Sequence, residues 1–264
     1  MTTSLEILRD ASAEEARRFF ADVEPEALVE AMRATDDDLL LELLTRDEVR
    51  PAAVTGIAQR LDEYAVPARL AEVKGLVRLD LHGDGTSAES RVLELADGTL
   101  RLHEPDAAPG PADVTITTSV LRFVRLVSGE RNAGLEYLGG TLDIDGDEML
   151  ALAVGGLFRV PGTDVALDPT ALDPVDVATV LAGASTEHLR KVVSGAFRPI
   201  VLGEIFRQLP DHVNPRRAAK VRVTIAFRLT GRPDGGLDRY VVTVDHGVTT
   251  VAEGEPDGDS DRDR

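Results

Sequence analysis

The amino-acid sequence predicts an α+β fold with a twisted, mostly antiparallel sheet, present as one full copy and a truncated second copy. Three observations predict it. Paired helical segments precede strands in which apolar residues alternate with polar ones. Each set of strands ends in a hairpin with a glycine at its turn. This order of elements occurs twice, at a shift of about 148 residues.

The helical segments correspond between the two halves. In each half the second helix opens on a polar capping run, residues 35–38 in one half and 185–187 in the other. In each half it ends before an Arg-Pro pair, Arg50-Pro51 or Arg198-Pro199, where a helix stops and restarts. The repeat therefore starts with two helices in both halves.

The strands that follow also keep their phase. Residues 73–81 and 221–229 alternate in the same register, with Val77 at the position of Ile225, and each is expected to be a half-buried strand. Hairpins with turn glycines follow in both halves, over residues 91–102 with Gly98 and over residues 240–251 with Gly247. Internal duplication explains why helices, strands and turns all stay in register.

Only the first half continues beyond its hairpin. Residues 114–117 predict a short strand, and Thr118 or Ser119 is expected to cap a helix that runs to Gly129. Residues 135–144 predict two strand segments around a Gly-Gly pair.

The acidic stretch DIDGDE, residues 143–148, has two interpretations. A calcium loop needs glycine at its sixth position and glutamate at its twelfth, whereas here Gly146 is fourth and the twelfth residue is Val154. We therefore expect a turn, with Asp147 capping a last apolar helix over 148–154.

The sequence predicts five segments. They are an N-terminal helical segment (1–50), a full α+β domain (51–158), a helical segment that repeats residues 10–50 (159–198), a partial half-domain (199–252) and a disordered acidic tail (253–264).

Composition excludes several classes of function. The chain has no cysteine, and its net charge of −18 disfavours nucleic acid and anything beyond transient contact with membranes. Neither a signal peptide nor an apolar run of membrane-spanning length is found, so we expect a soluble, cytoplasmic protein. No nucleotide-binding or nucleophile motif occurs, and no cofactor, metal or enzymatic activity is expected. The histidines lie outside metal-ligand spacing and are expected at the surface: His82, His103, His188, His212 and His246.

The continuation of the first half resembles the sterol-carrier-protein-2 (SCP2) family. The resemblance lies in the strand DVTIT at 113–117, the segment LVSG at 126–129 and the stretch GTLDIDGD at 140–147. It covers about residues 51–158 in full and 199–254 for half a domain, where Asn214-Pro215 and a strand ending near Gly231 match the family pattern. The first half departs from that pattern with Val66-Pro67. The resemblance implies a sheet and helices that enclose an apolar tunnel for sterols or acyl chains.

Apolar residues of the continuation are candidates for lining such a tunnel. Four of them lie on one stripe of the helix that ends at Gly129, and the others lie in the last strand and helix. Most apolar stripes of this kind belong to an ordinary core. The candidate lipid-binding residues are Val120, Phe123, Val124, Val127, Leu142, Ile144, Met149, Leu150, Ala153 and Leu157.

Two functions therefore remain open. The first is non-enzymatic binding and transfer of a lipid or sterol-like molecule. The second is a scaffold or accessory role, because the truncated half leaves a sheet edge and an apolar face that its own full copy, a second chain in a homodimer or an enzyme partner would have to cover.

Overall fold

The computed structural model describes residues 4–83, 88–232 and 234–255. The chain forms two units, Met1–Leu172 (unit 1) and Asp173–Arg264 (unit 2). The tail predicted to be disordered lies, from residue 256 onward, outside the described residues.

Unit 1 is an α+β unit, as the sequence predicts. Its helices and strands are α1 (Ala13–Asp22), α2 (Pro25–Ala34), α3 (Asp37–Thr45), α4 (Arg50–Ala58), α5 (Pro67–Leu70), β1 (Gly75–His82), β2 (Glu89–Ala96), β3 (Thr99–His103), β4 (Val114–Ser119), α6 (Val120–Val127), α7 (Ala133–Leu138), β5 (Asp143–Gly146) and α8 (Glu148–Gly155), with short 3-10 turns at Leu5–Leu8, Leu61–Tyr64 and Pro105–Ala107.

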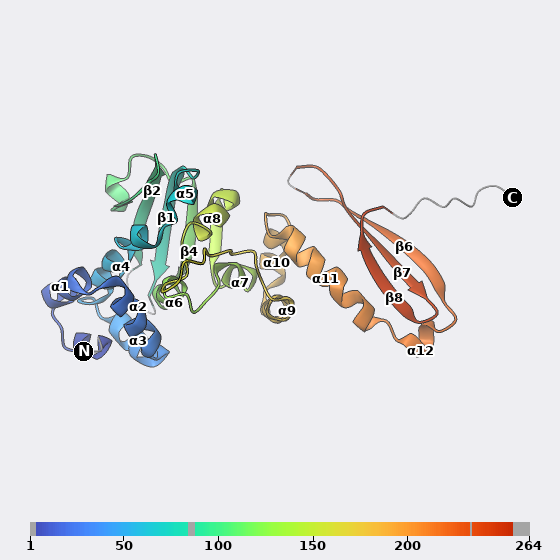
Figure 1. The fold of residues 1–264 in the computed structure, drawn as a ribbon, viewed down its shortest axis with the longest axis horizontal. Helices are drawn as coiled ribbons and strands as arrows, with labels where there is room; N and C mark the ends of the chain where they lie inside the picture. The colour runs from blue at the N-terminus through green and yellow to red at the C-terminus, as the bar shows by residue number, and fades with distance from the viewer. Residues whose placement is uncertain (1–3, 84–87, 233, 256–264) are drawn as a thin grey trace. The chain divides into compact units, whose positions relative to one another are not determined.

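Five strands of unit 1 form one sheet in the order β3-β2-β1-β4-β5. Figure 1 shows its central strands β2, β1 and β4 side by side. Every neighbouring pair is antiparallel except β1 and β4, which run parallel. On β1 the alternating residues Val77, Leu79 and Leu81 are buried. α4, α6 and α8 pack on the sheet. Arg91 of β2 is the register partner of Leu79, so the two side chains lie on the same face of the sheet. The Arg91 guanidinium donates to Thr55 of α4. The buried face of the sheet is thus the helix-covered face.

The N-terminal helices add to the helical layer. α1 packs on α4, where a Cβ at Gly56 would lie 2.5 Å from the Cβ of Phe20, so the glycine permits the close approach. α2 and α3 pack on α6. Ser12 begins α1 with a capping box, accepting from the Glu15 N–H while the Glu15 carboxylate accepts from the Ser12 N–H. This layer places α3 beside α6, where the candidate site lies.

The structure corrects one predicted element. Residues 135–144 do not form two strand segments, because Ala133–Leu138 is helix α7 and the last strand begins only at Asp143. The Asn132 side chain accepts hydrogen bonds from the N–H groups of Gly134 and Leu135, which caps a helix. This local capping interaction outweighs the strand propensity of the short apolar stretch.

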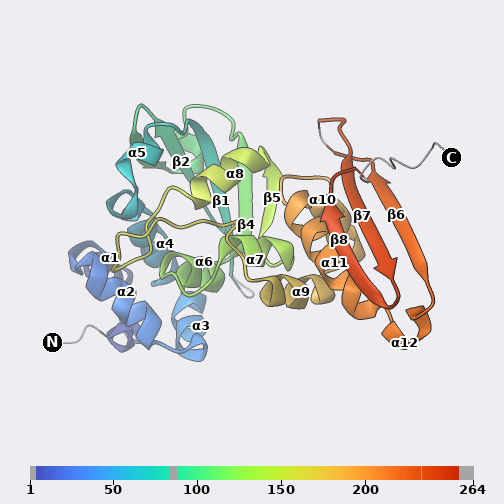
Figure 2. The same ribbon diagram turned by 45° about the vertical axis from the view of Figure 1, so that its right-hand side comes forward.

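Unit 2 contains four helices and three strands among its described residues. They are α9 (Pro174–Gly183), α10 (Thr186–Val192), α11 (Arg198–His212), α12 (Pro215–Ala218), β6 (Arg222–Leu229), β7 (Asp238–Asp245) and β8 (Val248–Glu253). The strands form an antiparallel sheet in the order β6-β7-β8 (Figure 2).

The core of unit 2 lies between α11 and this sheet. Leu202 and Phe206 of α11 are buried with Tyr240 and Val242 of β7. The Phe206 and Tyr240 rings stack at 3.8 Å between centroids. Phe227 and Leu229 pack against the cluster from the C-terminal half of β6.

The N-terminal half of β6 is not covered. Val221, Val223 and Ile225 are 41%, 39% and 44% exposed, so the expectation of burial along the whole apolar face is wrong here. In unit 1 the corresponding Val77 is fully buried. A helix, α6, packs on β1, whereas the closest helix packing on the sheet of unit 2 is that of α11 on β8, the edge strand opposite β6.

The two units share the side-chain contacts and turn geometry at two of the matched positions. Each has a buried arginine at the first residue of a helix: Arg50 Nε donates to Glu89 at 3.2 Å, and Arg198 Nε donates to Asp238 at 2.7 Å. Each hairpin turn has two residues with positive φ, Asp97-Gly98 and His246-Gly247. These details support the duplication, which stays a prediction.

Candidate functional site

The predicted lipid-binding residues lie on α6, β5, α8 and the segments that flank them. Most are part of the core of unit 1. Those with an exposed fraction of 8% or less are Val120, Phe123, Val124, Leu142, Ile144, Leu150 and Leu157. α6 and α8 both pack on β4, so the structure brings these elements to one region of the sheet. Their role in binding a ligand stays a prediction.

α8 is buried on one face only. Met149 is 66% exposed and Ala153 is also exposed, whereas Leu150, Ala151 and Val154 are buried. Asp147 caps α8 by accepting from the Leu150 N–H, as predicted. One face of α8 packs on β4 and β5, and the face with Met149 and Ala153 lies at the surface.

A cavity of about 320 Å³ lies where β1 and β4 end. His82 and Ser119, the last residues of these parallel strands, are register partners, so both strands end at one edge of the sheet. α3 contributes one wall and the start of α6 contributes another. The lining residues are Asp37, Leu41, Leu44, Thr45, His82, Gly83, Ser119, Val120, Leu121, Arg122, Arg125 and Arg131.

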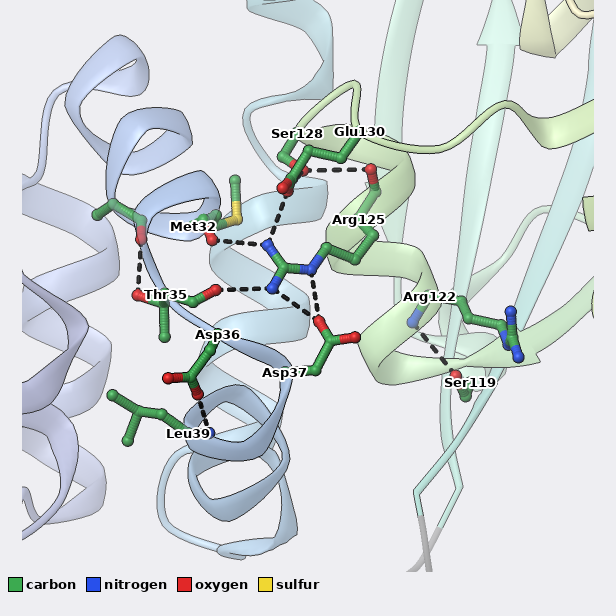
Figure 3. Close-up of polar contacts among 11 residues, drawn as sticks. Met32, Thr35, Asp36, Asp37, Leu39, Ser119, Arg122, Arg125, Ser128 and Glu130 are labelled. Atoms are coloured by element: carbon green, nitrogen blue, oxygen red, sulfur yellow. Dashed lines mark hydrogen bonds and ion pairs between the residues drawn. The ribbon is translucent and has the colours of Figure 1, made fainter.

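Arg125 joins α6 to the N-terminal helices beside this cavity (Figure 3). Its guanidinium donates to the Met32 carbonyl at 2.9 Å, the Thr35 carbonyl at 2.6 Å and the Asp37 carboxylate at 2.7 and 2.9 Å. It also donates to Glu130 at 2.8 Å. Burial lowers the pKa of Arg125, but its hydrogen bonds to Glu130 and Asp37 outweigh burial and raise that pKa. Arg125 is therefore a permanent cation that connects α2, α3 and α6.

Two other arginines converge on one buried carboxylate. Arg122 Nη1 lies 2.6 Å and Arg131 Nη1 lies 2.7 Å from the two oxygens of Glu136, whose exposed fraction is only 7%. Burial raises the pKa of Glu136, but hydrogen bonds from Thr141 and Arg131 and the charges of both arginines outweigh it and lower that pKa. Glu136 is therefore ionised at neutral pH and holds the two guanidinium groups in place.

This cluster of charged residues was not predicted from the sequence. Arg122 and Arg125 interrupt an otherwise apolar helix, VLRFVRLV, and that interruption is the only signal the sequence offers. Their partners Asp37 and Glu136 are up to 88 residues away along the chain, so their pairing depends on the tertiary fold.

The other polar residues singled out in the sequence have local partners. His103 lies 2.7 Å from Glu94, on the neighbouring strand. The DIDGDE stretch forms β5 and the start of α8. No helix in the described part of the chain is long and apolar enough to cross a membrane.

Comparison with known proteins gives the family. The model of the SCP-2 sterol transfer family matches residues 56–159. This segment, which is less than half of the chain, is similar to the SCP2 family. The SCP2 domain thus runs from within α4 to just beyond α8 and contains the whole five-stranded sheet, whereas α1–α3 and unit 2 lie outside the match.

Several solved structures are similar to the chain. Sterol carrier protein 2 from Yarrowia lipolytica, in its apo form, is 22% identical with a TM-score of 0.36, and the match covers 46% of this chain and 98% of that chain. The UbiJ-SCP2 ubiquinone synthesis protein is 20% identical with a TM-score of 0.33, and the match covers 41% of this chain and 94% of that chain. The inverting sec-alkylsulfatase Pisa1 from Pseudomonas sp. is 14% identical with a TM-score of 0.33, and the match covers 60% of this chain and 33% of that chain. No curated protein matches the sequence.

Proposed function

We propose that the SCP2 domain binds an apolar lipid, a sterol or a fatty acyl chain, in its interior and carries it in the cytoplasm without enzymatic chemistry. The family match over residues 56–159 carries this proposal. The apolar stripe of α6, with Val120, Phe123 and Val124, supplies the surface against which the ligand would lie. Each buried CH₂ group of a ligand contributes about 0.8 kcal/mol, so an apolar interior binds lipid without a cofactor or metal.

The proposal predicts that lipid accompanies the gently purified full chain. An organic extract analysed by mass spectrometry is expected to contain fatty acyl or sterol-like molecules. Ligand at about a hundred times its Kd is expected to stabilise the protein by about 2.7 kcal/mol, which is measured as a higher unfolding temperature. Amide hydrogen exchange is expected to slow in α6 and α8 and to stay unchanged in β6–β8. An empty extract together with an unchanged unfolding temperature would refute lipid binding.

We propose a second function in assembly, because β6 pairs on one edge only within the described part of the chain and Val221, Val223 and Ile225 form an exposed apolar patch at its start. Residues 214–232 include six Arg or Lys residues and no Asp or Glu, in a chain with a net charge of −18. Charge complementarity thus favours a partner strand in which acidic and apolar residues alternate, added to the edge of β6.

This second function predicts that a synthetic peptide of alternating Val and Glu binds the full chain. Fluorescence anisotropy is expected to show saturable binding that weakens at high salt. The variant Val223→Lys/Ile225→Lys should lose the binding, whereas Val248→Lys, at an exposed site on the opposite edge strand, should keep it. Binding that both variants retain, or self-association of the chain in place of peptide binding, would contradict this partner.

A further inference from the structure

The cavity at the end of β1 and β4 has two chemically different walls. Leu41 and Leu44 of α3, with Val120 and Leu121 of α6, make it apolar on one side. Arg122 and Arg131 add cationic groups. At about 320 Å³ the cavity lies at the small end of the range for ligand sites and has room for a head group and the first part of a chain.

The three arginines that line the cavity differ in what they can still bind. Arg125 donates to two carbonyls and two carboxylates and is saturated. Among the described residues, the side chains of Arg122 and Arg131 each donate only to Glu136. A guanidinium has five N–H donors, so both retain donors for a ligand. Figure 3 shows the Arg122 side chain extending away from the Arg125 cluster.

The local charge favours an anion. One carboxylate, Glu136, balances two guanidinium groups, which leaves this cluster with a net charge of +1. Asp37, the lining acid in the described part of the chain, faces Arg125 and is paired with it. Guanidinium groups bind carboxylate and phosphate in a bidentate manner, and burial of Glu136 fixes the position of both donors in advance.

We propose that Arg122 and Arg131 bind the carboxylate or phosphate head group of an amphiphile, with its first methylene groups against Leu44 and Val120. This inference rests on the proposed lipid binding and specifies which lipids are preferred. Because α3 lies outside the segment matched by the SCP2 family, one wall of this site is contributed by the N-terminal helices. A neutral lipid with a hydroxyl head group gains no ion pair here.

The test compares three ligands that share one chain length. Palmitate, hexadecyl phosphate and 1-hexadecanol are titrated against the full chain by displacement of a neutral fluorescent lipid. At least one anionic ligand is expected to bind tenfold or more tightly than the alcohol. Comparing palmitate with hexadecyl phosphate shows whether the site prefers a carboxylate or a phosphate. Equal affinities for all three would overturn the inference.

The matched variant is Arg122→Met/Arg131→Met/Glu136→Gln, which removes both cations without leaving a buried unpaired carboxylate. Its affinity for palmitate and for hexadecyl phosphate should be at least tenfold lower than that of the native chain. Its affinity for hexadecanol should stay within twofold of the native value. Arg78→Met, a change on the other face of the sheet, should keep the native preference. If the triple variant does not fold, Arg131→Met keeps the Arg122–Glu136 pair and should still weaken anionic ligands selectively.

The outcomes separate this inference from the proposed function. If hexadecanol binds and neither anionic ligand is preferred, the arginine site is wrong while lipid binding stands. If the folded variant keeps the anionic preference, the site is also wrong. If none of the three ligands binds the native chain, lipid binding itself fails.

Discussion

Replacing Arg125 by alanine is expected to lower the unfolding free energy of unit 1 by about 2–4 kcal/mol. The substitution removes a guanidinium that satisfies the Met32 and Thr35 carbonyls at the end of α2 and the Asp37 carboxylate at the start of α3. This cost is lower than that of breaking a fully buried ion pair, because the Asp37 side chain is 51% exposed and regains water.

Hydrogen exchange locates this effect. In Arg125→Ala, amides of α2 and α3 should exchange faster while those of β1 and β2 change less, because the lost contacts join α6 to the N-terminal helices. Arg125→Lys should recover only part of the stability, since an ammonium group cannot reach two carbonyls and a carboxylate in one plane. As a control, Arg18→Ala removes an exposed ion pair and should cost less than about 1 kcal/mol. Equal costs for Arg125→Ala and Arg18→Ala would contradict the role assigned to Arg125.

Local sequence signals predicted the elements that depend on neighbours in the chain. Ser119 caps α6 by accepting from the Arg122 N–H, and Asp147 caps α8, both as predicted. The hairpins were predictable because turn glycines and alternating residues act over a few positions. The SCP2 family was likewise recognisable from short motifs around β4 and β5.

Features that depend on tertiary contacts were not predictable in this way. The stretch from Val221, which directly precedes β6, to Ile225 alternates like β1, but alternation does not reveal whether a second strand and a helix cover it. The Arg122–Glu136–Arg131 cluster combines residues of α6, α7 and the loop between them, and their charges alone suggest only a solvated surface. Burial of Glu136 is what distinguishes this cluster from a surface ion pair.

Replacing Arg198 by alanine is expected to unfold unit 2 while leaving unit 1 folded. Arg198 and Asp238 are both nearly buried, and their ion pair at 2.7 Å connects the start of α11 to the start of β7. Arg198 also donates to the carbonyls of Val193 and Thr230, at 2.8 and 2.7 Å. Removing one partner of a buried pair costs about 3–5 kcal/mol. The apolar cluster in unit 2 is small, so this cost is comparable with the whole stability expected of a unit of this size.

Two further variants separate a lost ion pair from a general loss of packing. Arg198→Met/Asp238→Leu removes both charges and leaves none unpaired, so it should restore much of the protection of β6–β8 against hydrogen exchange. Arg239→Ala breaks the exposed pair with Glu255 and should leave that protection nearly unchanged. If Arg198→Ala leaves exchange in β6–β8 at the native rate, the buried pair does not hold unit 2 together. Both Arg198→Ala and the apolar double variant lack the hydrogen bonds from Arg198 to the Val193 and Thr230 carbonyls. If the two variants are equally unfolded, these hydrogen bonds contribute more to stability than the ion pair.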